Sequence, residues 1–99
     1  MKKLEFSSPG QLLLKEFIRP LGLTQYRVAK DCGIPHPTMT LIINGRRSIS
    51  AETAVRLGRY FGTGPEFWLN LQTAYDLRQL REEKLQLIQQ QVQPLRRAA

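Results

Sequence analysis

The stretch CGIPHPTMTLIINGRRSIS, residues 32–50, decides the fold of this 99-residue chain. Gly33 is suited to end a helix, whereas Pro35 and Pro37 are tolerated only in the first turn of the next one. Apolar side chains then recur at helical spacing until the Asn-Gly pair at residues 44–45, which is expected to end the helix. They are Met39, Ile42 and Ile43. The stretch therefore predicts two helices joined by a tight turn, the second followed closely by paired arginines.

Capping residues on either side of this stretch predict the other helices. Ser8 before Pro9 begins a first helix, in which we expect α-helical spacing through Phe17 until Pro20 and Gly22 end it. The second, fourth and fifth helices are expected to begin at Thr24, Ser50 and Pro65. Because no segment alternates with a two-residue period, we predict an all-α chain of five helices.

The chain divides into a domain and a tail. Its length suffices for one core, and apolar residues keep helical spacing to about residue 80. From residue 81 the sequence turns polar and rich in glutamine. We therefore expect a domain over residues 1–80 and a C-terminal extension over 81–99 that either prolongs the fifth helix or frays.

Positive charge is concentrated in the first half of the chain. Fifteen Lys and Arg against eight Asp and Glu give a net charge of +7. Residues 1–49 hold eight basic and three acidic side chains, and residues 50–99 hold seven and five. This excess favours a polyanion as partner and assigns its contact to the first half.

Two short helices joined by a glycine-containing turn are typical of the helix-turn-helix arrangement, whose second helix enters the DNA major groove. Apolar residues of both helices are expected to share one core, which leaves the opposite face for bases. The predicted base-contacting side chains are His36, Pro37, Thr38, Thr40 and Leu41. Those predicted to contact the DNA backbone are Gln25, Asn44, Arg46 and Arg47.

Within this predicted face, direct hydrogen bonding to bases is expected to be sparse. Pro37 and Leu41 are apolar and suit thymine methyl groups, while His36 and Thr40 supply the polar contacts. Alternatively, His36 is only an exposed turn residue.

The chain resembles, over roughly residues 7–80, the HigA-type antitoxins, a branch of the phage-repressor-like helix-turn-helix (XRE) family. The NGRR tetrad followed by IS, and the later FGTGPEFWLNLQ, are typical of that branch. The resemblance implies a small dimer that binds an operator and represses its own operon. It also implies neutralisation of a toxin of the RelE-like class, which cleaves mRNA on the ribosome.

The fifth helix carries more apolar surface than one face of a small domain needs. Phe67, Trp68, Leu71 and Tyr75 are expected to close the core or to serve oligomer contacts. A second stripe consists of Leu69, Ala74, Leu77 and Leu80. Because a two-fold interface is self-complementary, this stripe predicts a homodimer with recognition helices about 34 Å apart on a palindromic operator.

The sequence contains no recognisable catalytic, metal or cofactor site. One His and one Cys are present, and no phosphate-cradling glycine-rich loop is found. Cys32 is expected to be a small core residue. No apolar run reaches the length of a signal peptide or a membrane span, so we expect a cytoplasmic protein that is not an enzyme and makes no membrane contact.

Three functions remain open at this point. The first is a DNA-binding antitoxin, the second a stand-alone transcriptional regulator without a toxin. The third is a protein-interaction module, or regulatory domain of an enzyme, that keeps the fold without binding DNA. A neighbouring reading frame for a small toxin would separate the first from the second, and salt-dependent promoter binding would exclude the third.

Overall fold

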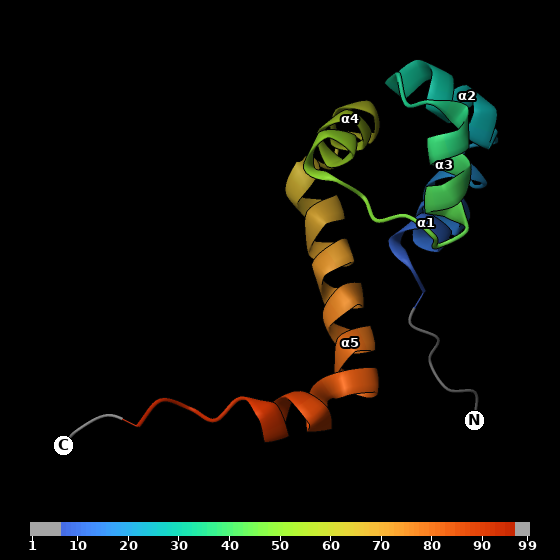
Figure 1. Cartoon of the computed structure of the whole chain (residues 1–99). Coiled ribbons are helices and arrows are strands. Elements are labelled where there is room, and N and C mark those ends of the chain that lie inside the picture. Colours follow the sequence, from blue (N-terminus) through green and yellow to red (C-terminus); the bar gives the residue numbers. More distant parts are fainter. Residues whose placement is uncertain (1–6, 97–99) are drawn as a thin grey trace.

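The computed structural model describes residues 7–96, which fold into helices and connecting loops without a strand (Figure 1). The elements are α1 (Pro9–Leu12), η1 (Leu13–Ile18), α2 (Gln25–Cys32), α3 (His36–Ile43), α4 (Ala51–Phe61) and α5 (Pro65–Gln91). Because η1 continues α1 without a break, the described chain has five helices, and the predicted all-α class is confirmed.

The helix ends follow the capping chemistry of the sequence. The hydroxyl groups of Ser8, Thr24 and Ser50 each accept a hydrogen bond from the backbone N–H three residues later. Gly33 and Gly62 end α2 and α4 in the left-handed conformation, with φ of 71° and 78°. These boundaries confirm the predicted helix starts and stops.

The first helix departs from the α-helical spacing that we predicted through Phe17. Its η1 part is π-helical, so hydrogen bonds span five residues, as from Arg19 N–H to the Leu14 oxygen at 3.0 Å. This winding places Leu13 and Ile18, five residues apart, in the core with 0% and 1% exposure. Uniform α-helical geometry was the wrong prediction because a short apolar run fits either period.

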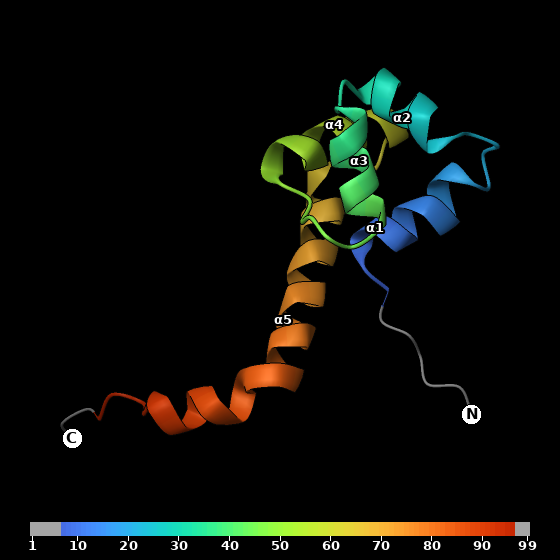
Figure 2. The same cartoon turned by 45° about the vertical axis from the view of Figure 1, so that its right-hand side comes forward.

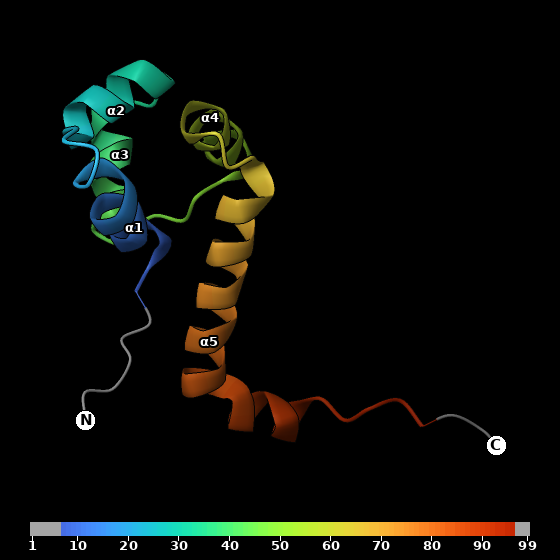
Figure 3. The ribbon, with the colours of Figure 1, turned by 180° about the vertical axis from the view of Figure 1, so that it is seen from behind.

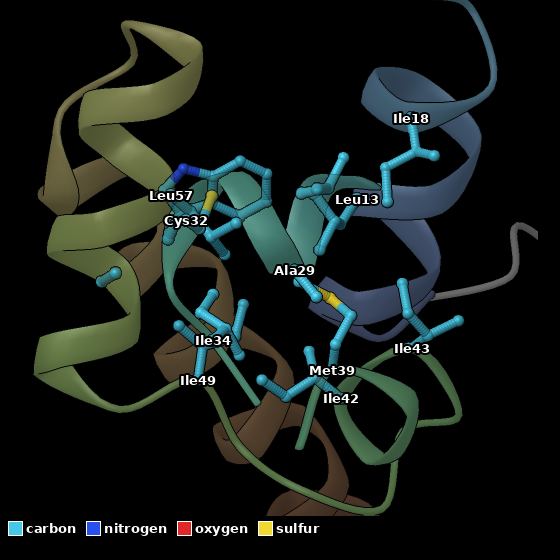
Figure 4. Close-up of a cluster of buried hydrophobic side chains, with 13 residues drawn as sticks. Leu13, Ile18, Ala29, Cys32, Ile34, Met39, Ile42, Ile43, Ile49 and Leu57 are labelled. Carbon is cyan, nitrogen blue, oxygen red and sulfur yellow. The ribbon is translucent and has the colours of Figure 1, made fainter. Parts of the chain in front are cut away.

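Side chains from every helix converge on one core, part of which is shown in Figure 4. The Phe17 ring lies 5.1 Å from that of Phe61 and 5.0 Å from that of Trp68. Trp68 is fully buried, whereas Phe67 at the edge of this cluster is 37% exposed. Of the four residues expected to close the core, Trp68 therefore does so completely, and Leu71 and Tyr75 are half-buried.

Two glycines allow backbones to touch where helices meet. A Cβ atom on Gly10 would lie 1.7 Å from the Ile42 carbonyl oxygen, so α1 packs directly against the end of α3. A Cβ on Gly58 would lie 2.4 Å from the Gly64 carbonyl carbon, at the junction of α4 with α5. Both contacts fix the orientation of helices around the core.

Helix α5 extends well beyond the rest of the domain. Its first half packs beside α4, and its distal half projects away and bends sharply (Figures 2 and 3). The helix passes residue 80 and continues to Gln91, so the first part of the predicted extension prolongs α5. No helix within residues 7–96 is both long and apolar enough to span a bilayer.

Candidate nucleic-acid interface

The turn between α2 and α3 sets the angle of the motif. Gly33 takes the left-handed conformation, and the Ile34 N–H donates to the Ala29 oxygen at 2.9 Å. Apolar side chains of both helices and the turn are then buried together, as Figure 4 shows in part. They include Val28, Ala29, Ile34, Met39 and Ile42, as predicted.

Opposite this core, α3 presents the side chains that we expect to meet DNA bases. His36, Pro37 and Leu41 are exposed, Leu41 by 38%. Thr38 and Thr40 are half-buried. All five therefore remain reachable, with His36 and Pro37 at the N-terminal end of the helix, where major-groove contacts concentrate.

Gln25 and Thr40 contact each other, which the sequence did not indicate. The Gln25 side-chain amide donates to the Thr40 hydroxyl oxygen at 2.9 Å, joining the start of α2 to the middle of α3. This bond leaves the second amide N–H and the carbonyl oxygen of Gln25 available, together with the Thr40 hydroxyl proton. A residue predicted to contact the backbone thus orients a residue predicted to contact a base.

Tyr26 is an interface candidate that sequence reasoning missed. Its side chain is 62% exposed, and its ring centroid lies 5.5 Å from that of His36. Its position beside Gln25 at the start of α2 is the signal that could have identified it. The two rings lie side by side at the N-terminal ends of α2 and α3.

Beyond α3, a loop carries two exposed arginines. Gly45 has a φ of 76°, and the Arg46 N–H donates to the Leu41 oxygen at 2.8 Å, which folds the loop back under α3. Arg46 and Arg47 are exposed, as is Asn44 at the helix end. Within residues 7–96 no carboxylate pairs with either guanidinium, so both remain available to an anion.

The first helix holds the C-terminal end of α3, a role that the sequence did not reveal. The Gln11 side-chain amide donates to the Ile43 carbonyl oxygen at 2.7 Å. Together with the close approach at Gly10, this bond fixes the end of the recognition helix. The only signal was a polar residue in the first turn of this helix, directly before a run of three leucines.

Asp31 links α2 to α4 on the surface. One of its carboxylate oxygens accepts from the Tyr60 hydroxyl at 2.6 Å and from the Arg27 guanidinium at 2.7 Å. The hydrogen bond from Tyr60, followed by that from Arg27, lowers the pKa of Asp31 from its ordinary value of 3.8. The same bond raises the pKa of Tyr60.

Cys32 ends α2 as a buried thiol, in agreement with the predicted core role. Burial raises its pKa to about 11, and the charge of Asp31 acts in the same direction. The residues described by the structure contain no cluster of three His, Cys, Asp or Glu side chains that could hold a metal ion.

The second apolar stripe of α5 is largely exposed. Leu77 and Leu80 are 42% and 41% exposed, and Ala74 is exposed as well. Leu69 is half-buried because it packs against the core. The distal half of the helix adds the exposed Leu85 and Leu87, which the predicted stripe did not include.

Comparisons with known proteins agree with this arrangement. A family model described as helix-turn-helix matches residues 14–68. The chain is 40% identical to antitoxin HigA-1 of Vibrio cholerae over 70 residues, 71% of this chain and 66% of that protein.

Two solved structures share the whole fold. An addiction module antidote protein of the HigA family from Coxiella burnetii superposes with a TM-score of 0.84 at 40% identity, covering 93% of this chain and 100% of that one. The Pseudomonas aeruginosa antitoxin HigA, solved with the higBA promoter, superposes with a TM-score of 0.86 at 34% identity and the same coverage. The chain therefore belongs to the HigA branch of the helix-turn-helix family.

Proposed function

We propose that this protein is a DNA-binding antitoxin that represses its own operon and neutralises a partner toxin. One observation carries the DNA-binding part: the exposed face of α3 is followed, just beyond the C-terminal end of the helix, by Arg46 and Arg47, which no described carboxylate pairs with. Such a face combines base-reading groups with phosphate-binding cations. The fold is that of a family of DNA-binding proteins that are not enzymes.

The interface divides into two kinds of contact. His36 and Thr40 supply hydrogen bonds to base edges, and the apolar Pro37 and Leu41 contact thymine methyl groups. Thr38 contributes at the same end of the helix. Backbone phosphates are held by Gln25, Asn44, Arg46 and Arg47, and Tyr26 supports His36 from the side.

A homodimer on a palindromic operator follows from the exposed stripe of α5. Two copies that pair through Leu69, Ala74, Leu77 and Leu80 present two α3 helices to successive major grooves about 34 Å apart. The exposure of Leu77 and Leu80 supports this pairing because neither is needed for the core.

The toxin is expected to be a RelE-like mRNA interferase encoded beside this gene. The support is the likeness to antitoxins named HigA, since such a protein is maintained with the toxin that it neutralises. An operator-binding protein of a bacterium acts in the cytoplasm, and we place this chain there.

The DNA-binding part is tested by titrating a labelled promoter fragment of the gene, and a scrambled fragment of equal length, at several salt concentrations. Binding to the promoter should be tighter, and log K should fall steeply with log salt as counterions are released. Replacing Arg46 and Arg47 by Ala should weaken both complexes and reduce the slope by about 0.9 for each lost phosphate contact. A parent protein that does not prefer its promoter would refute the proposed function.

The antitoxin part needs a separate measurement. The neighbouring small reading frame is expressed alone and together with this protein, and growth and mRNA integrity are recorded. We expect arrest and mRNA cleavage that coexpression reverses. Promoter binding without any such rescue would identify the protein as a stand-alone regulator.

A further inference from the structure

Gln72 is a buried polar side chain whose role the DNA interface and the dimer stripe do not explain. It lies on α5 as the last residue of the FGTGPEFWLNLQ stretch, and is 8% exposed. Its carbonyl oxygen accepts from the Ile49 backbone N–H at 2.9 Å, and its amide donates to the Asp76 carboxylate at 2.9 Å. Asp76 thereby fixes which end of the amide faces Ile49.

Ile49 belongs to the loop that joins α3 to α4 and carries the paired arginines. This loop is irregular, so its backbone groups have no helical partner and a buried N–H there needs another acceptor. Ile49 itself is 3% exposed, and its side chain lies in the core (Figure 4). Its side chain and the Gln72 bond therefore fasten the loop just after Arg46 and Arg47.

The other end of the loop is fastened too. The Arg46 N–H donates to the Leu41 oxygen, as described above, and Gly45 begins the loop in the left-handed conformation. Arg46 and Arg47 thus lie between two fixed points. They line a small hollow of about 130 Å³ together with Ser8, Gln72 and Asp76.

We propose that Gln72, oriented by Asp76, is a positioning residue that holds Arg46 and Arg47 against the DNA backbone and so couples α5 to the DNA interface. The proposal rests on the proposed function, because it assumes that both arginines bind phosphates. A purely structural Gln72 would instead contribute only to stability, through the satisfied Ile49 N–H.

Gln72→Met tests the role because methionine has similar length but neither donates nor accepts a strong hydrogen bond. Gln86→Met is the matched control, since Gln86 lies exposed in the distal half of the same helix and does not line the hollow beside the arginines. The double variant Gln72→Glu with Asp76→Asn reverses the polarity of the pair. A glutamate oxygen still accepts from Ile49, and the new asparagine donates to the other oxygen, at unchanged net charge.

Each variant is titrated with scrambled DNA over a salt series, at a temperature where far-UV circular dichroism and Trp68 fluorescence show it folded. For Gln72→Met we expect about fivefold to tenfold weaker binding and a slope reduced by about 0.9 to 1.8. The Gln86→Met control should stay within about twofold of the parent, and the reversed pair within about threefold, with the parent slope restored. In the background of Arg46→Ala with Arg47→Ala, Gln72→Met should have no further effect.

A folded Gln72→Met protein with the parent affinity and slope would overturn the inference. So would an equal loss in the background that lacks both arginines, because Gln72 would then act elsewhere. Should Gln72→Met fail to fold, Asp76→Ala decides, since Asp76 is exposed: a reduced slope supports the inference and an unchanged slope overturns it. If the double arginine variant binds like the parent, the proposed interface fails instead, independently of Gln72.

Discussion

Thr40 is held in place before any DNA arrives. Its hydroxyl oxygen accepts the Gln25 amide at 2.9 Å, so its remaining proton has a restricted range of directions. A base-reading group that is already ordered loses less conformational freedom when it binds. We therefore expect Gln25 to contribute to sequence readout as well as to backbone contact.

Replacing Thr40 by Ala should cost about 1–3 kcal/mol on operator DNA and little on scrambled DNA, because a base contact is lost. Thr40→Ser keeps the hydroxyl and should lose much less. Combined with Gln25→Ala, the loss should be smaller than the sum of the single losses, since the two groups act as a pair. Equal losses on both DNAs would make Thr40 a backbone contact.

The Asp31 carboxylate should govern part of the acid sensitivity of the fold. Its folded pKa is lowered, so its contribution to stability is present above the ordinary pKa of 3.8 and is lost as pH falls from there through the folded pKa. Asp31→Asn should therefore unfold at lower urea concentration than the parent at pH 7, and the gap should close at lower pH. Trp68 fluorescence during urea unfolding measures this.

A suitable control for that experiment is Glu83→Gln, which removes a carboxylate from the distal half of α5. It should leave the urea midpoint of the domain unchanged. If the urea midpoints of the parent and of Asp31→Asn change with pH in parallel, the contacts of Asp31 with Tyr60 and Arg27 contribute nothing to the stability of the fold.

At the scale of elements, the helix boundaries were predictable because capping is local chemistry. Ser8, Thr24 and Ser50 cap the helices they precede, and Gly33 and Gly62 end the helices they follow. These signals depend on a few neighbouring residues. They therefore hold whatever the rest of the chain does.

The parts of the site that escaped prediction depend on how the helices cross. The bond from Gln25 to Thr40 joins residues on two helices, and that from the Ile49 N–H to Gln72 spans 23 positions. The sequence around Gln25 and Gln72 gives no sign of either bond, because glutamine is a common surface residue. The π-helical winding of η1, which buries both Leu13 and Ile18, had no local signal either, because the apolar run also fits α-helical spacing.

Cys32 provides a probe for the opening of α2. Its pKa of about 11 leaves roughly a hundredfold less thiolate at pH 8 than the ordinary value of 9.0 would, and burial slows access further. Labelling by a disulfide reagent should therefore be at least about a hundred times slower in the folded than in the urea-unfolded protein. Rapid labelling of the folded protein would show that α2 leaves the core readily.

At the scale of the whole molecule, the long α5 is the feature that we expect to connect two copies. Its first half closes the core with Trp68, while the exposed side carries Leu77 and Leu80. One helix therefore serves both the fold of a single chain and the expected assembly of two.

Leu77→Glu with Leu80→Glu should give a folded monomer that binds operator far more weakly than the parent, because core residues are untouched and two half-sites are no longer joined. Analytical ultracentrifugation measures the oligomeric state. Leu85→Glu with Leu87→Glu introduces the same charge farther along α5 and should remain dimeric. If the Leu77 and Leu80 variant stays dimeric and the Leu85 and Leu87 variant is monomeric, the dimer interface lies in the distal half of α5.

The backbone contacts at Gly10 and Gly58 also have a genetic consequence. Any side chain at Gly10 would collide with the Ile42 carbonyl, and any at Gly58 with the Gly64 backbone. A change in the first or second base of a glycine codon introduces such a side chain or, in the single case of GGA to TGA, a stop codon. Alleles that lose repression should therefore accumulate at these two codons, which tolerate mutation only in their third base although neither residue belongs to the DNA-reading face.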